Sequence, residues 1–479
     1  MTSRRALLQL TVFGFLLANL PLVASAQSQS SSSEVEQLRR LVLDLEQRVS
    51  ALEEQNRRLS QVSALPDRSG PQSAAALQLA SAELREGPGD EPEPTREAGP
   101  GTASAGLLPG TLPGGATLNY YFDGYYEYNF NAPIGRVNDL RPYDVLSNTF
   151  SLNQADFIFD LDPDLDAHRR YGFRVDLQFG QATETLQGNP ANEPRPEIYR
   201  DIFQAYGTYV VPAGHGINID FGKWASSLGI EGNYAKDQMN YTRSYYFYFL
   251  PFYHAGVRAS YKINNKWTAN YWVVNGTNQS EPTNGYKDEL FGWSATPAKS
   301  LIWTFNYYNG QEHPNTVPAS NCTVPVQPGL CEAPINPAPT GKTQIVDTYG
   351  TWQASQKLTL AGEADYFLQR QWSYSAPNHV DGGAAYAQYQ LNARASLAAR
   401  DEYLSDRGGL FSNQTQALKE ATVTYKYNFA DGFDAFLEYR RDWSNRPYFI
   451  TSSPTITANH QDTATLGLVW WYGGKQGSW

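Results

Sequence analysis

Residues 170–180 read RYGFRVDLQFG, and in this stretch large apolar side chains alternate with small or polar ones. The odd-numbered positions are apolar or aromatic: Tyr171, Phe173, Val175, Leu177 and Phe179. The even-numbered positions between them are small or polar: Gly172, Arg174, Asp176 and Gln178. Successive side chains of a β-strand point to opposite faces, so the stretch predicts a strand with one apolar and one polar face.

Runs with the same period of two recur up to residue 473. We predict sixteen strands, at residues 118–130, 148–161, 170–180, 198–210, 215–224, 254–263, 267–276, 287–296, 301–309, 344–353, 357–368, 383–391, 395–404, 417–428, 433–442 and 462–473. The connections alternate in length: residues 131–147 and 181–197 are long, whereas VPAG at 211–214 is short. An even count of strands of about ten residues, with short turns at one end and long loops at the other, is typical of outer-membrane β-barrels.

The sequence therefore predicts an all-β fold, a transmembrane antiparallel β-barrel of about 16 strands. A sheet survives in hydrocarbon only when it closes, because every unpaired backbone N–H or C=O there is costly. A polar lumen accounts for the negative mean hydropathy, and an aromatic content of 14% suits the girdles at the two membrane interfaces. The alternative is a soluble, secreted β-sandwich, but its exposed face should be polar and its loops should not alternate strictly in length.

The first segment of the chain has the pattern of a secretory signal peptide. Arg4 and Arg5 precede an apolar core that is short for a membrane-spanning helix, and small residues follow at 24–26. We assign residues 1–26 to this signal and expect the mature chain to begin near Gln27.

Residues 34–62 predict an oligomerising coiled coil, because apolar residues recur at alternating steps of three and four. The seam consists of Val35, Leu38, Val42, Leu45, Val49, Leu52, Asn56 and Leu59. A single amphipathic helix docked on a neighbouring surface is the alternative. Residues 63–116 are rich in Pro, Gly, Ala, Ser and Glu and predict a disordered linker, either a spacer or filler. The barrel is expected over 117–479, ending in Trp479, a terminal aromatic of the kind that serves barrel assembly.

Charge and motif content exclude several function classes. The formal net charge is −11 and Lys and Arg form no basic run, so nucleic acid is not an expected partner. The sequence has neither GxSxG nor HExxH, and its histidines show no metal-ligand spacing, so we expect no enzyme, no metal and no cofactor. His254 near Arg258 and Ser260 loosely suggests a lipase. Cys322 and Cys331 predict a disulfide, with a metal site as the alternative.

Four stretches of the chain resemble the OmpL-like family of bacterial outer-membrane β-barrel porins. They are RYGFRVDLQFG, FGKWASSLGIEGNYAKDQMNYTRSYYFYFLPFYHAGVRASY at 221–261, RDEYLSD at 400–406 and KEATVTYKY at 419–427. The resemblance spans roughly residues 118–473 and implies an outer-membrane pore without specifying a solute. The coiled coil and the linker lie outside it.

The narrowest ring of a porin lumen sets the size and charge preference of the channel. The third long loop, residues 225–253, is the candidate constriction, and its charged residues are Glu231, Lys236, Asp237 and Arg243. The alternative is an outward loop that covers the rim. Inward strand positions carry acids at Asp123, Glu127, Asp156, Asp160, Asp176, Asp220, Glu363, Asp365, Glu402, Glu420 and Glu438. The inward bases are Arg174, Arg200, Arg258, Lys262, Arg400, Lys426 and Arg440, and each charge could instead belong to an ordinary cross-strand pair.

Acids outnumber bases in this lining, so the sequence predicts a water-filled channel for passive diffusion of small hydrophilic solutes and ions, weakly cation-preferring or non-selective. Inward Trp272, Tyr308 and Tyr386 leave a sugar-selective channel as an alternative. An anion-selective channel and a structural anchor for the coiled coil are two others. The expected partners are outer-membrane lipid, one or two further copies of the chain, the barrel-assembly machinery and peptidoglycan. The N-terminal region is expected in the periplasm.

Overall fold

The structure is a computed structural model, and it describes residues 112, 115–187, 193, 196–318, 332–430 and 432–473. The predicted signal peptide, the coiled coil and most of the linker lie outside the described residues. So do Cys322, Cys331 and the terminal Trp479, and the predictions that concern them stay predictions.

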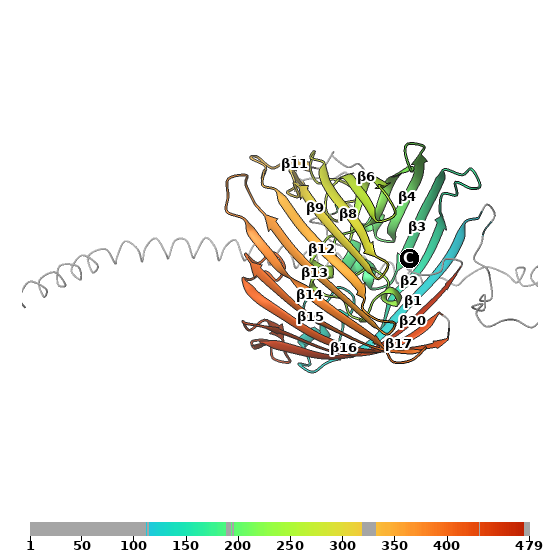
Figure 1. Cartoon of the computed structure of the whole chain (residues 1–479). Coiled ribbons are helices and arrows are strands. Elements are labelled where there is room, and N and C mark those ends of the chain that lie inside the picture. Colours follow the sequence, from blue (N-terminus) through green and yellow to red (C-terminus); the bar gives the residue numbers. More distant parts are fainter. Residues whose placement is uncertain are drawn as a thin grey trace, which may run out of the picture. The chain divides into compact units, whose positions relative to one another are not determined.

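Sixteen antiparallel strands close into one barrel, which Figure 1 shows as tilted arrows running from cyan β1 to red β20. In order around the barrel they are β1 (Thr117–Asn129), β2 (Thr149–Leu161), β3 (Tyr171–Phe179), β4 (Ile202–Val211), β5 (Ile217–Ala225), β6 (Tyr253–Lys262), β7 (Trp267–Val274), β8 (Asp288–Ala298), β9 (Leu301–Gly310), β12 (Thr343–Gln353), β13 (Leu358–Gln369), β14 (Asn378–Gln390), β15 (Ala395–Arg407), β16 (Gln416–Ala430), β17 (Phe433–Ser444) and β20 (His460–Gly473). β1 pairs with both β2 and β20, so the barrel sheet has no free edge. The predicted all-β barrel of sixteen strands is confirmed.

Two predicted strand boundaries differ from the structure by more than a few residues. β4 begins at Ile202 and not at residue 198, because residues 196–199 form the short helix α4, with a proline in the first turn where helices accept it. β14 begins at Asn378, five residues earlier than predicted. The apolar residue of that segment, Val380, points inward and is fully buried, so the usual apolar-outward signal is missing there.

Short turns and long loops alternate as predicted, which gives the barrel a short-turn end and a long-loop end. Among the turns, residues 212–216, 263–266, 299–300, 354–357 and 391–394 connect neighbouring strands at the short-turn end. The long loops carry the remaining elements: η1 (Ile134–Arg136), α3 (Ala182–Gln187), α4 (Pro196–Tyr199), η2 (Ala235–Asp237), α5 (Tyr245–Phe249) and the small hairpins β10 (Thr316–Pro318) with β11 (Glu332–Pro334) and β18 (Phe449–Ile450) with β19 (Thr457–Ala458). Within the described residues, no helix is both long enough and apolar enough to cross a membrane.

The two faces of the wall differ sharply in polarity. In β1, the inward residues Asn119, Asp123 and Glu127 are buried, whereas outward Phe122 and Tyr128 are exposed. The same holds around the barrel, where outward Phe221 and Leu437 expose 72% and 62% of their surface. Exposed apolar area on this scale requires an apolar surrounding.

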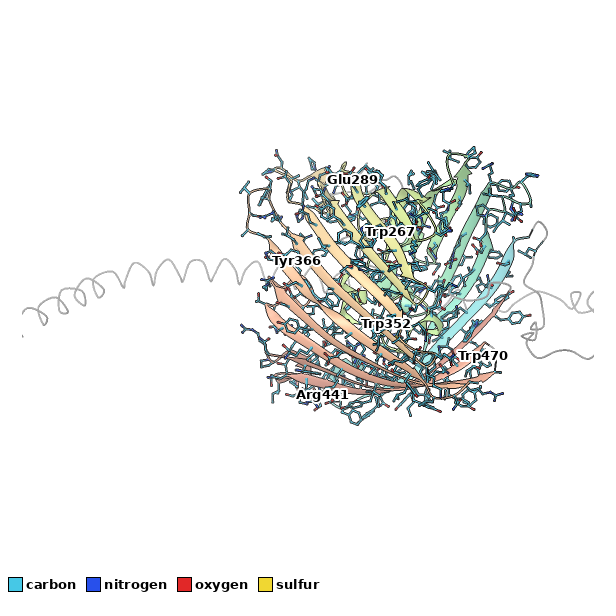
Figure 2. All side chains as sticks on the ribbon, viewed as in Figure 1. Trp267, Glu289, Trp352, Tyr366, Arg441 and Trp470 are labelled. Carbon is cyan, nitrogen blue, oxygen red and sulfur yellow. The ribbon has the colours of Figure 1, made fainter. Side chains whose placement is uncertain are left out.

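Aromatic side chains gather on the outer face at the short-turn end. Trp267, Trp352 and Trp470 lie near the strand termini there and are 40%, 49% and 60% exposed (Figure 2). Phe433 stacks on Trp470 with ring centroids 4.6 Å apart, and Phe429 lies 5.3 Å from Phe433. Such a belt matches the preference of amphipathic rings for a membrane–water interface.

Candidate functional site

The loop between β5 and β6, residues 226–252, lies inside the barrel and is called the inner loop below. It forms hydrogen bonds with inward residues of β1, β3, β12, β13, β15, β16 and β17. In Figure 1, green loop and helical segments are visible between the strands of the wall. Because these strands lie on different sides of the barrel, the loop crosses the lumen and does not merely cover the rim. Its role as the constriction stays a prediction.

Two carboxylates of the wall bind backbone N–H groups of the inner loop. Glu438 accepts hydrogen bonds from the N–H of Tyr241 at 2.7 Å and from the N–H of Thr242 at 3.0 Å. Glu402 accepts from the N–H of Tyr245 at 2.9 Å. Tyr245 is the first residue of α5, where N–H groups have no partner within the helix, so Glu402 supplies the missing acceptor.

Arg400 joins the wall to the inner loop through three groups. Its guanidinium lies 2.7 Å from Glu231 of the loop and 2.9 Å from Glu420 of β16. It also donates to the carbonyl oxygen of Thr242 at 2.7 Å. Because Arg400 is almost fully buried, this pairing offsets the desolvation of its charge.

Arg440 makes a second such connection, on β17. Its guanidinium lies 2.7 Å from Asp442 on the same strand and donates to the carbonyl oxygen of Arg243 at 2.5 Å. Asp442 also pairs with Arg141 of the first long loop at 2.7 Å and accepts from the hydroxyl of Tyr245 at 2.7 Å. One wall carboxylate thus ties two loops together.

Tyrosines attach the inner loop to β1 and β3, and β1 is separated from β17 by only one strand, β20. Tyr241 donates to Asp123 at 2.6 Å, and Tyr234 donates to Asp176 at 3.0 Å. The hydroxyl of Tyr121 accepts from the N–H of Ala235 at 2.8 Å. Gly229 of the loop is bound to Asp347 of β12, which lies across the barrel from β3, so the loop is held on two facing sides of the lumen.

The other charged residues of the inner loop are held within it or against the wall. Lys236 pairs with Asp237 at 2.8 Å, and burial lowers the pKa of the Lys236 amine. Lys426 of β16 donates to the carbonyl oxygen of Lys236 at 2.9 Å. Arg243 donates to the carbonyl oxygen of Gly232 at 2.9 Å, which draws two parts of the loop together.

The acidic strand positions predicted to face inward are all at least nine-tenths buried. They are Asp123, Glu127, Asp156, Asp160, Asp176, Asp220, Glu363, Asp365, Glu402, Glu420 and Glu438. Arg258 and Asp220 lie directly opposite each other on β6 and β5 and pair at 2.6 Å, which is the cross-strand pairing left open by the sequence. Arg174 pairs with Asp176 on its own strand at 2.9 Å.

Two predicted inward bases lie elsewhere. Arg200 is not on a strand: it follows α4, pairs with Glu197 at 2.8 Å and is about a third exposed. Lys262 is the last residue of β6 and is exposed at the short-turn end. The predicted alternation began before the first residue of β4 in the case of Arg200, and it ran to the last residue of β6 in the case of Lys262. At the ends of a strand the direction of a side chain is no longer fixed.

His254 does not form the site that the lipase hypothesis needs. Its Nε2 lies 3.1 Å from the hydroxyl of Ser226, and not of Ser260, while its Nδ1 lies 3.1 Å from the carbonyl oxygen of Gly276. In the Ser-His-Asp triad a carboxylate at Nδ1 orients and charge-stabilises the imidazole, whereas Nδ1 of His254 faces a backbone carbonyl oxygen. The fully buried His254 is therefore a structural residue that fixes the start of the inner loop.

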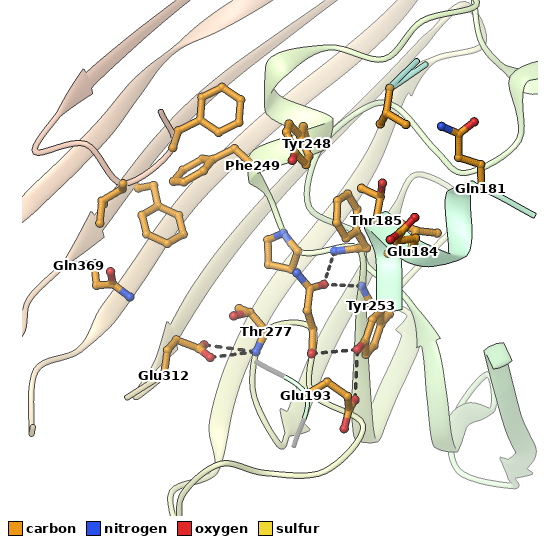
Figure 3. Close-up of a pocket in the computed structure, with 18 residues that line it drawn as sticks. Gln181, Glu184, Thr185, Glu193, Tyr248, Phe249, Tyr253, Thr277, Glu312 and Gln369 are labelled. Atoms are coloured by element: carbon orange, nitrogen blue, oxygen red, sulfur yellow. Dashed lines mark hydrogen bonds between the residues drawn. The ribbon is translucent and has the colours of Figure 1, made fainter. Parts of the chain in front are cut away.

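A cavity of about 700 Å³ opens between the inner loop and the long loops (Figure 3). Part of its lining is aromatic: Phe249 lies 4.7 Å from Phe367 and 5.5 Å from Phe411, measured between ring centroids. We call this cavity the vestibule. The aromatic run of residues 245–249, within the predicted constriction loop, is the sequence feature that contributes to this lining.

The polar part of the vestibule contains two glutamates (Figure 3). Glu193 accepts from the hydroxyl of Tyr253 at 3.2 Å. Glu312 accepts from the N–H of Thr277 at 3.2 Å, and burial together with the neighbouring Asp288 raises the pKa of Glu312 to about 8. Aromatic rings and the carboxyl groups of Glu193 and Glu312 thus form part of the lining of the vestibule.

Comparison with known proteins identifies one family. Residues 115–470 match the family described as "Putative beta-barrel porin-2, OmpL-like". No curated protein sequence matches the chain.

Solved structures with a similar arrangement are outer-membrane proteins. The outer membrane channel DcaP of Acinetobacter baumannii is 12% identical, with a TM-score of 0.48 over 76% of this chain and 100% of that one. The in-vitro folded trimer form of OmpT of Vibrio cholerae is 10% identical, with a TM-score of 0.48 over 74% and 99%. An anion-selective porin from Comamonas acidovorans is 6% identical, with a TM-score of 0.46 over 74% and 99%.

Proposed function

The chain belongs to the OmpL-like family of β-barrel porins, and from this premise we propose that it forms a water-filled channel in the outer membrane for passive diffusion of small hydrophilic solutes. The observation that carries the proposal is the inner loop, which crosses the lumen and is hydrogen-bonded to β12 on one side and to β3 on the facing side. A loop in this position narrows a wide barrel and so limits the size of the solute that passes.

The ionic contacts support a weak preference for cations. The buried wall arginines Arg400 and Arg440 each pair with a carboxylate, and so does Arg258. In contrast, Asp156 and Asp365 have no basic partner within 4.0 Å among the described residues. A lumen whose residual charge is negative concentrates cations.

Planar-bilayer recording of the full chain tests the channel. We expect stepwise currents and, in a potassium chloride gradient, a reversal potential of the sign that marks potassium as the more permeant ion. Deleting residues 233–242 and joining the ends with two glycines should raise the single-channel conductance, because the crossing part of the inner loop is removed. Bilayers that stay silent while containing folded protein would contradict the proposal.

Such silence would instead favour the structural anchor, in which a plugged barrel fastens the N-terminal coiled coil to the envelope. The density of bonds between the inner loop and the wall is the observation in favour of that alternative. A sugar-selective channel has less support, since Trp272, Tyr308 and Tyr386 are each less than 10% exposed and present no open ring faces.

The proposal includes a homo-oligomer of two or three chains, embedded in outer-membrane lipid, with the N-terminal region in the periplasm. Association through the coiled coil, contact with peptidoglycan and recognition by the barrel-assembly machinery all rest on the sequence. Native mass spectrometry of the detergent-solubilised chain, with and without residues 34–62, tests the first of these. An unchanged mass distribution would remove the coiled coil as the oligomerising element.

A further inference from the structure

Three carboxylates meet on the inner face of the wall where the inner loop begins. Asp347 of β12 and Asp365 of β13 lie directly opposite each other, and Glu363 lies two residues from Asp365 on the same strand and face. One carboxylate oxygen from each of the three lies within 4.8 Å of the others. The three residues are 0%, 6% and 6% exposed.

The arrangement concentrates negative charge without a compensating base. Like charges directly opposite each other destabilise a strand pair. The next strand places Gly382 and Ala384 beside Asp365 and Glu363, so no cation comes from that side. In the part of the chain that the structure describes, no salt bridge involves any of the three carboxylates.

Hydrogen bonds satisfy only two members of the cluster. Asp347 accepts from the N–H of Gly229 at 3.1 Å and from the side-chain amide of Asn306 at 2.7 Å. Glu363 accepts from the N–H of Ile230 at 3.2 Å. Both oxygens of Asp365 are buried and accept no hydrogen bond from an N–H group or a hydroxyl among the described residues; the carboxyl faces that of Asp347, to which it could be joined only by a shared proton.

Buried polar groups are almost always satisfied, so an orphaned carboxylate beside two others indicates a missing partner of positive charge. The ligand set consists of hard oxygen atoms, which calcium and magnesium prefer. Two oxygens that bind one calcium at about 2.4 Å are separated by at most about 4.8 Å, and the three carboxylate oxygens lie within that limit. Magnesium demands near-ideal octahedral geometry, keeps several of its waters and is usually held by only one or two carboxylates, so a group of three protein carboxylates suits calcium better.

We propose that Asp347, Glu363 and Asp365 bind a calcium ion that fastens the start of the inner loop to the wall. The loop joins the site through Gly229 and Ile230, whose N–H groups orient two of the carboxylates. Water from the lumen completes the six to eight ligands that calcium takes. The proposal does not depend on conduction, because it concerns attachment of the loop and would also hold for a plugged barrel.

Calcium binding is measured on the full chain, folded in detergent and stripped with a chelator. Isothermal titration calorimetry gives the affinity, and terbium luminescence gives the location, since tyrosines close to a bound lanthanide sensitise its emission. Tyr386 is suited to this role, because its hydroxyl lies 3.5 Å from Glu363. We expect one site with a dissociation constant on the order of 10⁻⁴ to 10⁻³ M, as in weak extracellular calcium sites.

The critical variant is Asp365→Asn, which keeps the shape of the side chain and removes its charge. The calcium affinity should fall at least tenfold and the terbium emission should be lost. The matched control is Asp381→Asn, on the neighbouring strand, because Asp381 pairs with Arg407 and is not part of the cluster. The control should bind calcium as the wild type does.

Thermal unfolding provides a readout that a misfolded variant cannot imitate. Without calcium, Asp365→Asn should unfold at a higher temperature than the wild type, because one of three repelling charges is gone. With saturating calcium the order should reverse, since only the wild type gains binding free energy. If calcium has no effect on the wild type, or affects Asp365→Asn equally, the three carboxylates share protons and the proposal is wrong.

Discussion

Glu438→Gln is the substitution that tests most directly how the wall holds the inner loop. One oxygen of Glu438 accepts from the N–H of Tyr241 at 2.7 Å and from the hydroxyl of Thr424 at 2.6 Å. The other accepts from the N–H of Thr242 at 3.0 Å and from its hydroxyl at 2.5 Å. All four partners are donors, and both oxygens of the carboxylate are needed as acceptors.

Glutamine keeps the size of the side chain but replaces one acceptor oxygen with an NH₂ donor. A hydroxyl can rotate and accept from that group, whereas the N–H of Tyr241 or Thr242 has no such freedom and loses its partner. A buried unsatisfied N–H costs about 1–3 kcal/mol, and the remaining bonds lose their charge assistance. We estimate that attachment of the loop weakens by about 2–4 kcal/mol, which raises the detached population by about 30- to 1000-fold.

Trypsin provides the assay, because the inner loop contains Lys236 and Arg243 as cleavage sites. When opening and closing are faster than cleavage, the cleavage rate follows the population of the open form. We therefore expect Glu438→Gln to be cut within the inner loop about 30- to 1000-fold faster than the wild type. Single-channel records of the same variant should show larger and noisier currents.

The matched control is Glu289→Gln, which makes the same chemical change on the outer face of β8, where Glu289 accepts a hydrogen bond from Tyr271 (Figure 2). It should be cut at the wild-type rate. A Glu438→Gln variant that is cut within twofold of this control would show that the carboxylate does not hold the loop, and our account of the attachment would fail.

Three further substitutions test other parts of the barrel. Gly467→Ala places a methyl group 2.4 Å from the ring of Tyr241, so the inner loop should shift at a cost of about 1–3 kcal/mol, seen as a changed single-channel conductance. Burial and the Asp288 charge raise the pKa of Glu312 to about 8, so the vestibule should gain a negative charge between pH 7 and pH 9. The reversal potential should then move toward stronger cation preference, and Glu312→Gln should abolish that change. Leu437→Arg puts a charge on the outer face and should reduce the folded fraction in lipid by about 2–4 kcal/mol if the residue lies near the midplane. Heat-modified gel mobility measures that fraction.

The strands of the barrel wall could be predicted because the pattern that indicates them lies within a few neighbouring residues. Alternation in RYGFRVDLQFG needs only neighbouring residues, and the strand found there, β3, covers Tyr171–Phe179. The family resemblance rested on similar local stretches and is confirmed. Where local periodicity stops, prediction failed: Arg200 was placed on a strand that begins only at Ile202.

The site could be predicted only in part, because its contacts join residues distant in sequence. The bond from the N–H of Tyr245 to Glu402 spans 157 positions, and no periodicity connects them. The sequence suggested Ser260 as the partner of His254, because the two residues are close in sequence. The partner in the structure is Ser226, which precedes His254 by 28 positions, at the other end of the inner loop. Asp347 was not singled out at all, since its importance appears only when the register sets it opposite Asp365.

Because contacts between residues distant in sequence cannot be predicted from local patterns, the ion preference of a barrel is difficult to derive from its sequence. Counting inward acids and bases treats every charge as free to act on a passing ion. Here Glu402 and Glu438 are occupied by backbone N–H groups of the inner loop, and Arg400 is shared between the loop and Glu420. A charge that is already compensated by a fixed partner contributes little field at a distance. The preference must therefore come from groups that the loop leaves uncompensated, such as Asp365, and a calcium ion bound there would reduce it further.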